Sequence, residues 1–459
     1  MKVLCVNVPN VHTRNGVLYT GPNSGSRWPW SAPSEMPFHG YAPYPFRLAY
    51  TVAYLRNHGI TADLYDGVAD RHANFDQVRT AIYNYKPDIA LFDVSTPCYD
   101  ITNEMALWTK NTLGCKIVFC GTHMKKYAAH SKAQAHVDHV ISGEMERPML
   151  DIVETGGKGT YEYMHLEKLD KLPDGTNFLP HREWEGLNRY YDPSMETARM
   201  QVQVNTSRAC PFSCTYCTTS RVFENAPYRA RSAEMVVDEL QTIKNRLGGA
   251  LGSFFFDDDT WNIGNARIKD ICKGLKDIGV PWTMMGRIDT STHDLYDIMV
   301  NSGCVGMRFG IESFDQRLLD NAKKSLSAKT TYDNIKYLLT RFSGLEFHFT
   351  TMKNLPGAAP DAWEKDKAIL QELIKEGAKN NNRVHYQNSE CVPFPGTELW
   401  EELVELGHGD KIADFHAYDG HPDHNQSLIK TIGLLGRNYA AKKSKWSDET
   451  GGPIGLPSS

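Results

Sequence analysis

The stretch SRACPFSCTYCTT, residues 207–219, places Cys210, Cys214 and Cys217 in a C-x3-C-x2-C array. Three thiols exceed the two that a disulfide joins and fall one short of the four ligands of a structural zinc site. The nearest histidines, His181 and His293, lie far outside the array. Thiolates also bind iron–sulfur clusters. A [4Fe–4S] cluster held by three cysteines has one iron without a protein ligand, so the array predicts a cluster with an open position for a substrate or cofactor.

The other seven cysteines are scattered, and several interrupt apolar, strand-like runs such as KIVFC. Buried cysteine behaves as a small hydrophobe, and thiols stay reduced in the cytosol. We therefore expect a packing role for Cys5, Cys98, Cys115, Cys120, Cys272, Cys304 and Cys391.

Six strand-like runs alternate with helix-like runs between residues 199 and 400, and the cysteine array directly follows the first of them. Repeated strand–helix units form parallel strands joined by right-handed crossovers. Six units predict a partial (β/α)6 TIM-like barrel, in which reacting groups collect where the strands end. The runs are RMQVQVNTS, SFFFDDDTW, WTMMGRID, VGMRFGIES, LEFHFTTM and RVHYQNSE.

Residues 1–155 also alternate strands and helices, with near-continuous apolar runs such as KVLCVNV and DIALFDVST. Such runs predict a parallel sheet covered by helices on both faces. The predicted fold class is therefore α/β. It comprises a Rossmann-like domain at 1–155, a connector at 156–198, the partial TIM-like barrel at 199–400 and a short C-terminal extension at 401–459.

Two irregular segments carry weaker signals. Residues 19–46 are rich in proline, glycine and aromatic residues, and a loop of that length suits either a lid over a pocket or an interface. The C-terminal extension contains irregularly spaced histidines between Gly, Asp and Pro residues: His408, His416, His421 and His424. We expect a solvated loop there rather than a metal site.

The bulk composition excludes several classes of function. The 459-residue chain is 41% hydrophobic and 23% charged, with a net charge of −5, as in ordinary globular proteins. It contains no Lys/Arg-rich block of the kind that binds nucleic acid. No run approaches the length of a membrane span, and the first apolar run is too short for a signal peptide. We expect a cytoplasmic protein without nucleic-acid or membrane partners.

A C-x3-C-x2-C array after the first strand of a partial barrel resembles the radical S-adenosylmethionine (SAM) superfamily. The resemblance implies that Cys210, Cys214 and Cys217 bind a [4Fe–4S] cluster whose open iron chelates SAM. Cleavage of SAM then yields a 5'-deoxyadenosyl radical that abstracts a substrate hydrogen, while the protein positions the cofactors. The resemblance also implies a small-molecule substrate and an external electron donor of the flavodoxin or ferredoxin type.

Further motifs resemble the same superfamily. Tyr216 stands where an aromatic residue packs on the SAM adenine, and FFFDDDTW ends the second strand, where the family contacts the SAM amino group. RFGIES and VPFPGTELW are similar to the ends of the fourth and sixth strands. A core tyrosine and a helix N-cap cluster of aspartates are the plainer interpretations. The implied SAM contacts are Tyr216, Asp257, Asp258, Arg287, Glu312 and Pro393, and the candidates for substrate binding are Asp259 and Glu390.

The N-terminal region resembles the subset of this superfamily that has a cobalamin-binding-like Rossmann domain. The similar stretches are residues 43–66 and 137–153, the second of which contains Gly143, Glu144 and Glu146. Many cobalamin domains carry D-x-H-x-x-G, whose histidine ligates cobalt. The stretch FDVSTPCYDIT has no histidine, and His123 lies in another loop. Cobalamin binding stays open, with a structural cap over the barrel as the alternative.

The resemblance leads to two enzymatic hypotheses and assigns no catalytic residue. The missing D-x-H-x-x-G favours radical dehydration or deoxygenation of an amino sugar, similar to the diol dehydratase of aminoglycoside (apramycin-type) antibiotic biosynthesis. The carboxylates at 257–259 and Glu390 suit such a cationic substrate. The alternative is a cobalamin-dependent radical SAM methyltransferase. A non-catalytic iron–sulfur protein is the rival from another class, since it would need none of the SAM-contact motifs.

Overall fold

The computed structural model describes residues 1–21, 32–33, 42–70, 75–172, 174–195, 197–219, 226–421 and 423–435. Most of the irregular segment at 19–46 and the end of the C-terminal extension fall outside these residues, so their expected roles stay predictions. Among the described residues, no helix combines the length and the hydropathy needed to cross a bilayer.

The N-terminal part of the chain forms a six-stranded parallel sheet with the order β5-β1-β6-β7-β8-β9. The strands β1, β6 and β7 are almost fully buried, because apolar side chains occupy both of their faces, whereas the edge strands β5 and β9 alternate buried and more exposed residues. The strands are β1 (Lys2–Asn7), β5 (Thr61–Asp66), β6 (Ile89–Asp93), β7 (Lys116–Cys120), β8 (His139–Ser142) and β9 (Thr160–Glu162). The helices are α1 (Phe46–Asn57), α2 (Phe75–Tyr85), α3 (Tyr99–Leu113), α4 (Met124–Lys132) and α5 (Glu146–Thr155).

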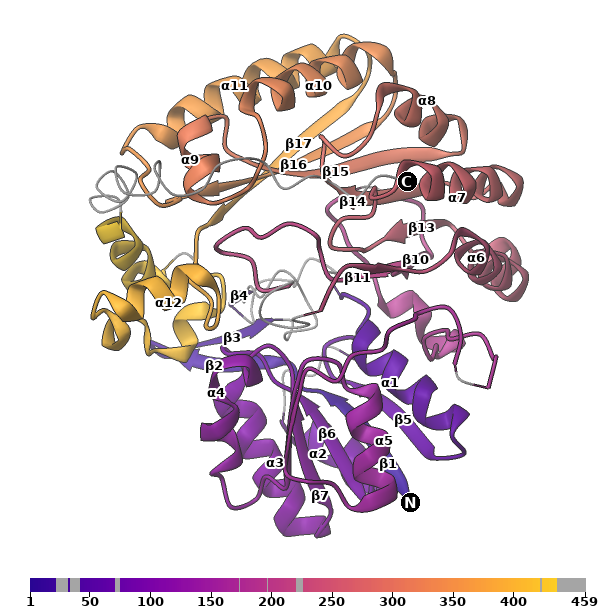
Figure 1. Ribbon diagram of the computed structural model, residues 1–459, viewed down its shortest axis with the longest axis vertical. Coiled ribbons are helices and arrows are strands. Elements are labelled where there is room, and N and C mark those ends of the chain that lie inside the picture. The colour runs from indigo at the N-terminus through magenta and orange to yellow at the C-terminus, as the bar shows by residue number, and fades with distance from the viewer. Residues whose placement is uncertain are drawn as a thin grey trace.

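The second half of the chain forms another six-stranded parallel sheet, with strands in sequence order. All six expected strands are present: β10 (Gln201–Val204), β13 (Ser253–Phe256), β14 (Trp282–Gly286), β15 (Cys304–Glu312), β16 (Glu346–Lys353) and β17 (Arg383–Glu390). Figure 1 shows this sheet curving as an arc with its helices on the outside. These helices are α6 (Ala233–Leu247), α7 (Asn265–Ile278), α8 (His293–Asn301), α9 (Gln316–Asn321), α10 (Ala328–Arg341) and α11 (Ala362–Ala378).

The remaining elements link the two sheets. A small antiparallel sheet follows β1 and contains β2 (Asn10–Arg14), β3 (Val17–Gly21) and β4 (Ala32–Pro33), while β11 (Ser207–Arg208) pairs with β12 (Arg229–Ala230). The helix α12 (Glu398–Glu405) follows the second sheet and lies near β2, β3 and α4 (Figure 1). Lys126 of α4 is paired with Glu401 of α12 at 3.0 Å, so α12 packs against the N-terminal half of the chain.

Candidate functional site

The three cysteines of the array line one cavity of about 250 Å³ at the carboxyl end of the second sheet. Backbone hydrogen bonds hold their loop in place: Thr215 N–H donates to the Ala322 carbonyl, and Leu399 N–H donates to the Thr215 carbonyl, both at 3.0 Å. Phe212 and Tyr216 of the same loop and Lys324 of the loop after α9 also line the cavity. Other lining residues come from the ends of five strands and include Asp259, Thr260, Met285, Arg287, Glu312, Thr350, Ser389, Glu390 and Phe394.

The cysteine thiols lie close enough to influence one another electrostatically. Burial, reinforced by the neighbouring Cys214, raises the pKa of Cys217 to about 12. Burial likewise raises the pKa of Cys210, whose sulfur lies 3.5 Å from Thr260 Oγ1. A cationic centre among neighbouring thiols stabilises them as thiolates. This donor set fits a metal cluster held by three thiolates.

A buried ion pair also lines the cavity. Glu312 ends β15 and accepts a hydrogen bond from Lys324 Nζ at 2.8 Å, with both side chains about 90% buried. Glu312 has a positive φ of 61°, next to a register shift in the pairing of β15 with β16. A Cβ on Gly310 would lie 2.9 Å from Glu312 Oε1 and 3.1 Å from Lys324 Nζ. The absence of a side chain at Gly310 therefore makes room for this pair.

Arg287 follows β14 and is held by several partners. Its guanidinium is ion-paired with Asp289 at 2.8 Å and donates hydrogen bonds to the carbonyl oxygens of Lys324 and Ser325. It also lies 3.7 Å from the ring centre of Phe212, which belongs to the cysteine loop. Arg287 thus ties the loop that carries Lys324 to the loop that carries the cysteines.

The three aspartates of FFFDDDTW have different surroundings. Asp259 lines the cavity and accepts a hydrogen bond from Thr219 at 3.3 Å. Asp258 is fully buried outside the lining, where it accepts hydrogen bonds from Thr206 N–H and from the Thr206 and Ser207 hydroxyls. Asp257 lies outside the lining as well. The structure therefore brings Asp259, but neither Asp257 nor Asp258, to the cysteine cavity.

The sixth strand contributes Glu390, which lines the cavity and accepts a hydrogen bond from Asn354 at 2.5 Å. Pro393 is not among the lining residues, although its neighbours Val392 and Phe394 are. Sequence reasoning did not single out Lys324, because nothing in DNAKKSLS distinguishes it from an exposed lysine. Only its pairing with Glu312 does so.

Residues 204–366 match the family model described as the radical SAM superfamily. The chain contains a radical SAM domain. This domain implies a [4Fe–4S] cluster and SAM as cofactors, in agreement with the three-cysteine cavity. The match runs from the last residue of β10 through β16 and therefore includes every residue that lines the cavity except those of β17 and of the loop after it.

Three known proteins resemble a larger part of the chain. An uncharacterized methyltransferase of Pyrococcus horikoshii is 26% identical over 376 residues, which cover 78% of each chain. The cytidylyl-2-hydroxyethylphosphonate methyltransferase of Streptomyces wedmorensis is 30% identical over 255 residues, which cover 54% of this chain and 45% of that protein. The radical SAM methyltransferase TsrM of Kitasatospora setae, solved with cobalamin and a [4Fe–4S] cluster, has a TM-score of 0.64 and 13% identity, covering 88% of this chain and 78% of its own. This last likeness concerns the fold, and it confirms the expected α/β architecture.

Buried ion pairs connect the radical SAM domain to the N-terminal sheet just before the cysteines. Arg208, two residues ahead of Cys210, is paired with Glu146 at 2.6 Å and with Glu144 at 3.2 Å. Arg229 on the neighbouring β12 also binds Glu144 at 2.6 Å. These arginines hold the pKa of Glu144 well below its usual range, although burial alone would raise it. The two glutamates of the GE-x-E turn thus position the start of the cysteine loop.

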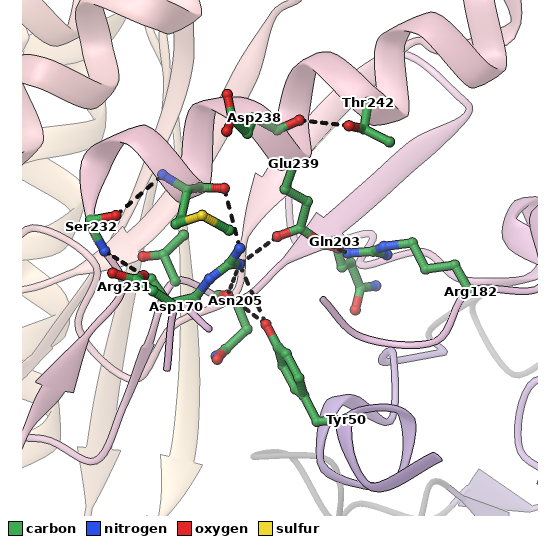
Figure 2. A network of polar contacts seen from close by, with 12 residues as sticks. Tyr50, Asp170, Arg182, Gln203, Asn205, Arg231, Ser232, Asp238, Glu239 and Thr242 are labelled. Carbon is green, nitrogen blue, oxygen red and sulfur yellow. Dashed lines mark hydrogen bonds and ion pairs between the residues drawn. The ribbon is translucent and has the colours of Figure 1, made fainter. Parts of the chain in front are cut away.

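A second buried network joins the same two parts, as Figure 2 shows. Glu239 of α6 binds Arg231, and it binds Arg182 at 3.0 Å. Arg231 also contacts the hydroxyl of Tyr50 on α1 at 3.4 Å. Burial raises the pKa of Glu239, but the two arginines outweigh this effect and lower it. This buried polar network therefore holds α1 against the first strand–helix unit of the radical SAM domain.

Proposed function

We propose that the protein is a cobalamin-dependent radical SAM methyltransferase acting on a small polar molecule. The observation that carries the proposal is the convergence of three cysteines and the Glu312–Lys324 pair on one cavity at the strand ends. When bound, the cluster supplies the electron that cleaves SAM, and cobalamin supplies the methyl carrier. Residues 199–400 would hold the cluster and SAM, and residues 1–155 would hold the corrinoid.

The cavity residues take distinct binding roles in this proposal. Cys210, Cys214 and Cys217 hold three irons and leave the fourth for SAM. Glu312 would accept hydrogen bonds from the SAM ribose hydroxyls, and Lys324 holds its carboxylate in place through the 2.8 Å ion pair. Tyr216 and the other apolar lining residues exclude water from the reacting centre.

Two carboxylates that line the cavity provide the polar contacts for the substrate. Asp259 and Glu390 both line the cavity and are acceptor-only when ionised, so they suit hydroxyl or ammonium groups. Arg287 acts as a positioning residue, since its guanidinium is committed to Asp289 and to the loop carbonyls. Asp258 is proposed to position the residues before the cysteine loop, since it binds Thr206 and Ser207.

The N-terminal sheet offers polar atoms that fit the amide groups of a corrinoid. Ligands of open α/β sheets bind at the carboxyl ends of strands where the strand order reverses, which here lies between β1 and β6. Among the described residues, Asn7 Oδ1, Ser95 Oγ and His123 Nε2 lie at the ends of β1, β6 and β7, buried and without a hydrogen-bond partner. Buried polar atoms are normally hydrogen-bonded, so these atoms suit a polar ligand.

Methyl transfer replaces amino-sugar dehydration as the favoured reaction. The two curated relatives and the solved structure compared above are methyltransferases by description. The absence of a D-x-H-x-x-G histidine in the loop after β6 does not count against this function, because a corrinoid can be held through its amide groups without a protein ligand to cobalt.

The test is an anaerobic reaction of the reconstituted protein, purified from cells supplied with hydroxocobalamin. We expect a corrinoid absorption that survives desalting, and 5'-deoxyadenosine or methylated product carrying label from methyl-labelled SAM. The variant Cys214→Ala should lose the iron–sulfur absorption, whereas Cys272→Ala, a buried cysteine of α7 outside the cavity, should keep it. A full-strength cluster in Cys214→Ala would contradict the ligand assignment, and a protein that never retains corrinoid would contradict the methyltransferase.

A further inference from the structure

A cluster of histidines lies between β2 and the C-terminal extension, away from the cysteine cavity. The expectation of a solvated loop is wrong for His424, which is 3% exposed. Asp419 is fully buried, and the side chain of His12 on β2 is 7% exposed. These three residues offer ligand atoms that all lie within 4.8 Å of one another.

The two imidazoles meet the same carboxylate oxygen. His12 Nε2 lies 3.1 Å from Asp419 Oδ2, and His424 Nδ1 lies 2.6 Å from that oxygen. The ring of Tyr19 on β3 packs against both histidines, at 5.5 Å from His12 and 4.4 Å from His424. Segments from opposite ends of the chain therefore form one buried, mostly aromatic pocket around a single carboxylate.

One nitrogen of His12 faces the carboxylate. His12 Nδ1 lies 3.2 Å from Asn10 Oδ1, and Nε2 lies 3.1 Å from Asp419 Oδ2. Nε2 is buried, and its contact with Asp419 does not have hydrogen-bond geometry. Buried polar atoms are normally hydrogen-bonded, so a ring nitrogen and a carboxylate that meet without a hydrogen bond suit a cation bound between them.

The position of His424 agrees with a metal ligand, because its Nδ1 faces the same carboxylate oxygen as His12 Nε2. Neutral imidazole is the form that binds metals, and with Nδ1 on a metal the ring proton lies on Nε2.

We propose that His12, Asp419 and His424 form a binding site for a divalent transition-metal ion, with zinc as the expected occupant. Two imidazoles, one carboxylate and an open position for water form a common zinc coordination set. Bonds of about 2.0 Å place tetrahedral ligand atoms roughly 3.3 Å apart. The His12–Asp419 distance of 3.1 Å already suits such a geometry, and the His424–Asp419 distance needs to lengthen from 2.6 Å by about 0.7 Å.

The ion would link residues 415–424 of the C-terminal extension to the N-terminal half of the chain. Asp419 and His424 follow the short helix η5 (Phe415–Tyr418), whose Phe415 packs at 5.0 Å on His123 after β7. Coordination by His12 adds a link to β2, directly after β1. The metal thus holds the C-terminal segment over the carboxyl end of the N-terminal sheet, and this role does not depend on the reaction at the cysteine cavity.

The test measures zinc and iron together in the cluster-loaded protein after anaerobic dialysis against zinc, using elemental analysis. We expect about one zinc per chain in the wild type in addition to the cluster iron. The variants His12→Ala and His424→Ala should lose the zinc and keep the iron. The matched control His408→Ala, in the same extension but outside the cluster, should keep both.

A second measurement avoids dependence on the variants. Cobalt(II) added to the cluster-loaded wild type should give visible ligand-field bands that zinc abolishes, and zinc should raise the thermal unfolding temperature. A wild type without zinc beyond background would overturn the proposal. Zinc retained in both histidine variants would also overturn it, as would zinc lost only in His181→Ala, which would place the ion at Asp63, His181 and Glu183.

Discussion

The ion pairs of Arg208 provide the sharpest test of how the N-terminal sheet supports the cysteine loop. The substitution Arg208→Met keeps the length of the side chain and removes its charge. It leaves Glu146 buried without Arg208, and it leaves Glu144 with Arg229. Breaking a buried ion pair on one side costs about 3–5 kcal/mol, because a charge stays buried without compensation. Since Arg208 stands two residues before Cys210, the loop should also hold its cluster less well.

The assay compares the free energy of unfolding in urea and the iron content of wild type and variant. The matched control is Arg341→Met, because Arg341 pairs with Asp297 at a similar distance of 2.7 Å, but the two side chains are 53% and 29% exposed. An exposed pair contributes about 0–1 kcal/mol, so the control should change little.

A double variant then separates the ion pair from other effects of the substitution. Adding Glu146→Leu to Arg208→Met removes the buried uncompensated carboxylate and should recover part of the stability, with a coupling of about 0.5–3 kcal/mol. If Arg208→Met lowers the free energy of unfolding no more than the exposed control and keeps its full iron content, the conclusion that the Arg208 ion pairs position the cysteine loop is wrong.

Two further predictions concern the second sheet. Glu312→Gln should weaken SAM binding by about 10- to 100-fold in calorimetry of the cluster-loaded protein, because a charge-assisted hydrogen bond is worth about 1.5–3 kcal/mol; an unchanged affinity would remove Glu312 from the SAM site. Burial, with Arg308 nearby, lowers the pKa of His348 from 6.5 to about 4. As pH falls from 6.5 to 4, the unfolded chain therefore binds a proton at His348 that the folded chain does not bind, so the free energy of unfolding decreases. Urea titrations should show that His348→Gln loses about 2 kcal/mol less than wild type between pH 7 and pH 5, and equal losses would argue against a neutral buried ring.

Much of the architecture could be predicted from local sequence patterns. The strands of both sheets are short, near-continuous apolar runs, and burial of both faces is what a parallel sheet requires. The cysteine spacing could also be interpreted without a structure, because three thiols in eight residues must converge locally whatever the rest of the chain does.

The roles of single charged residues were less predictable. Asp257, Asp258 and Asp259 look equivalent in sequence, yet their orientation depends on how β13 ends and on what lies beside it. Asp258 binds Thr206, which belongs to the neighbouring strand–loop unit. Glu144 was recognised by resemblance, but its partners Arg208 and Arg229 come from another part of the chain.

The sequence by itself determined two parallel α/β layers and a three-cysteine array after the first strand of the second layer, because both follow from the spacing of residue types over short stretches of the chain. Only the tertiary structure decided which carboxylates reach the cavity, that Lys324 faces Glu312, and that His12 meets His424. These contacts join residues from separate strand–helix units, and crossovers and sheet order bring them together. No local sequence pattern predicts these contacts, since each partner taken alone resembles an ordinary surface residue.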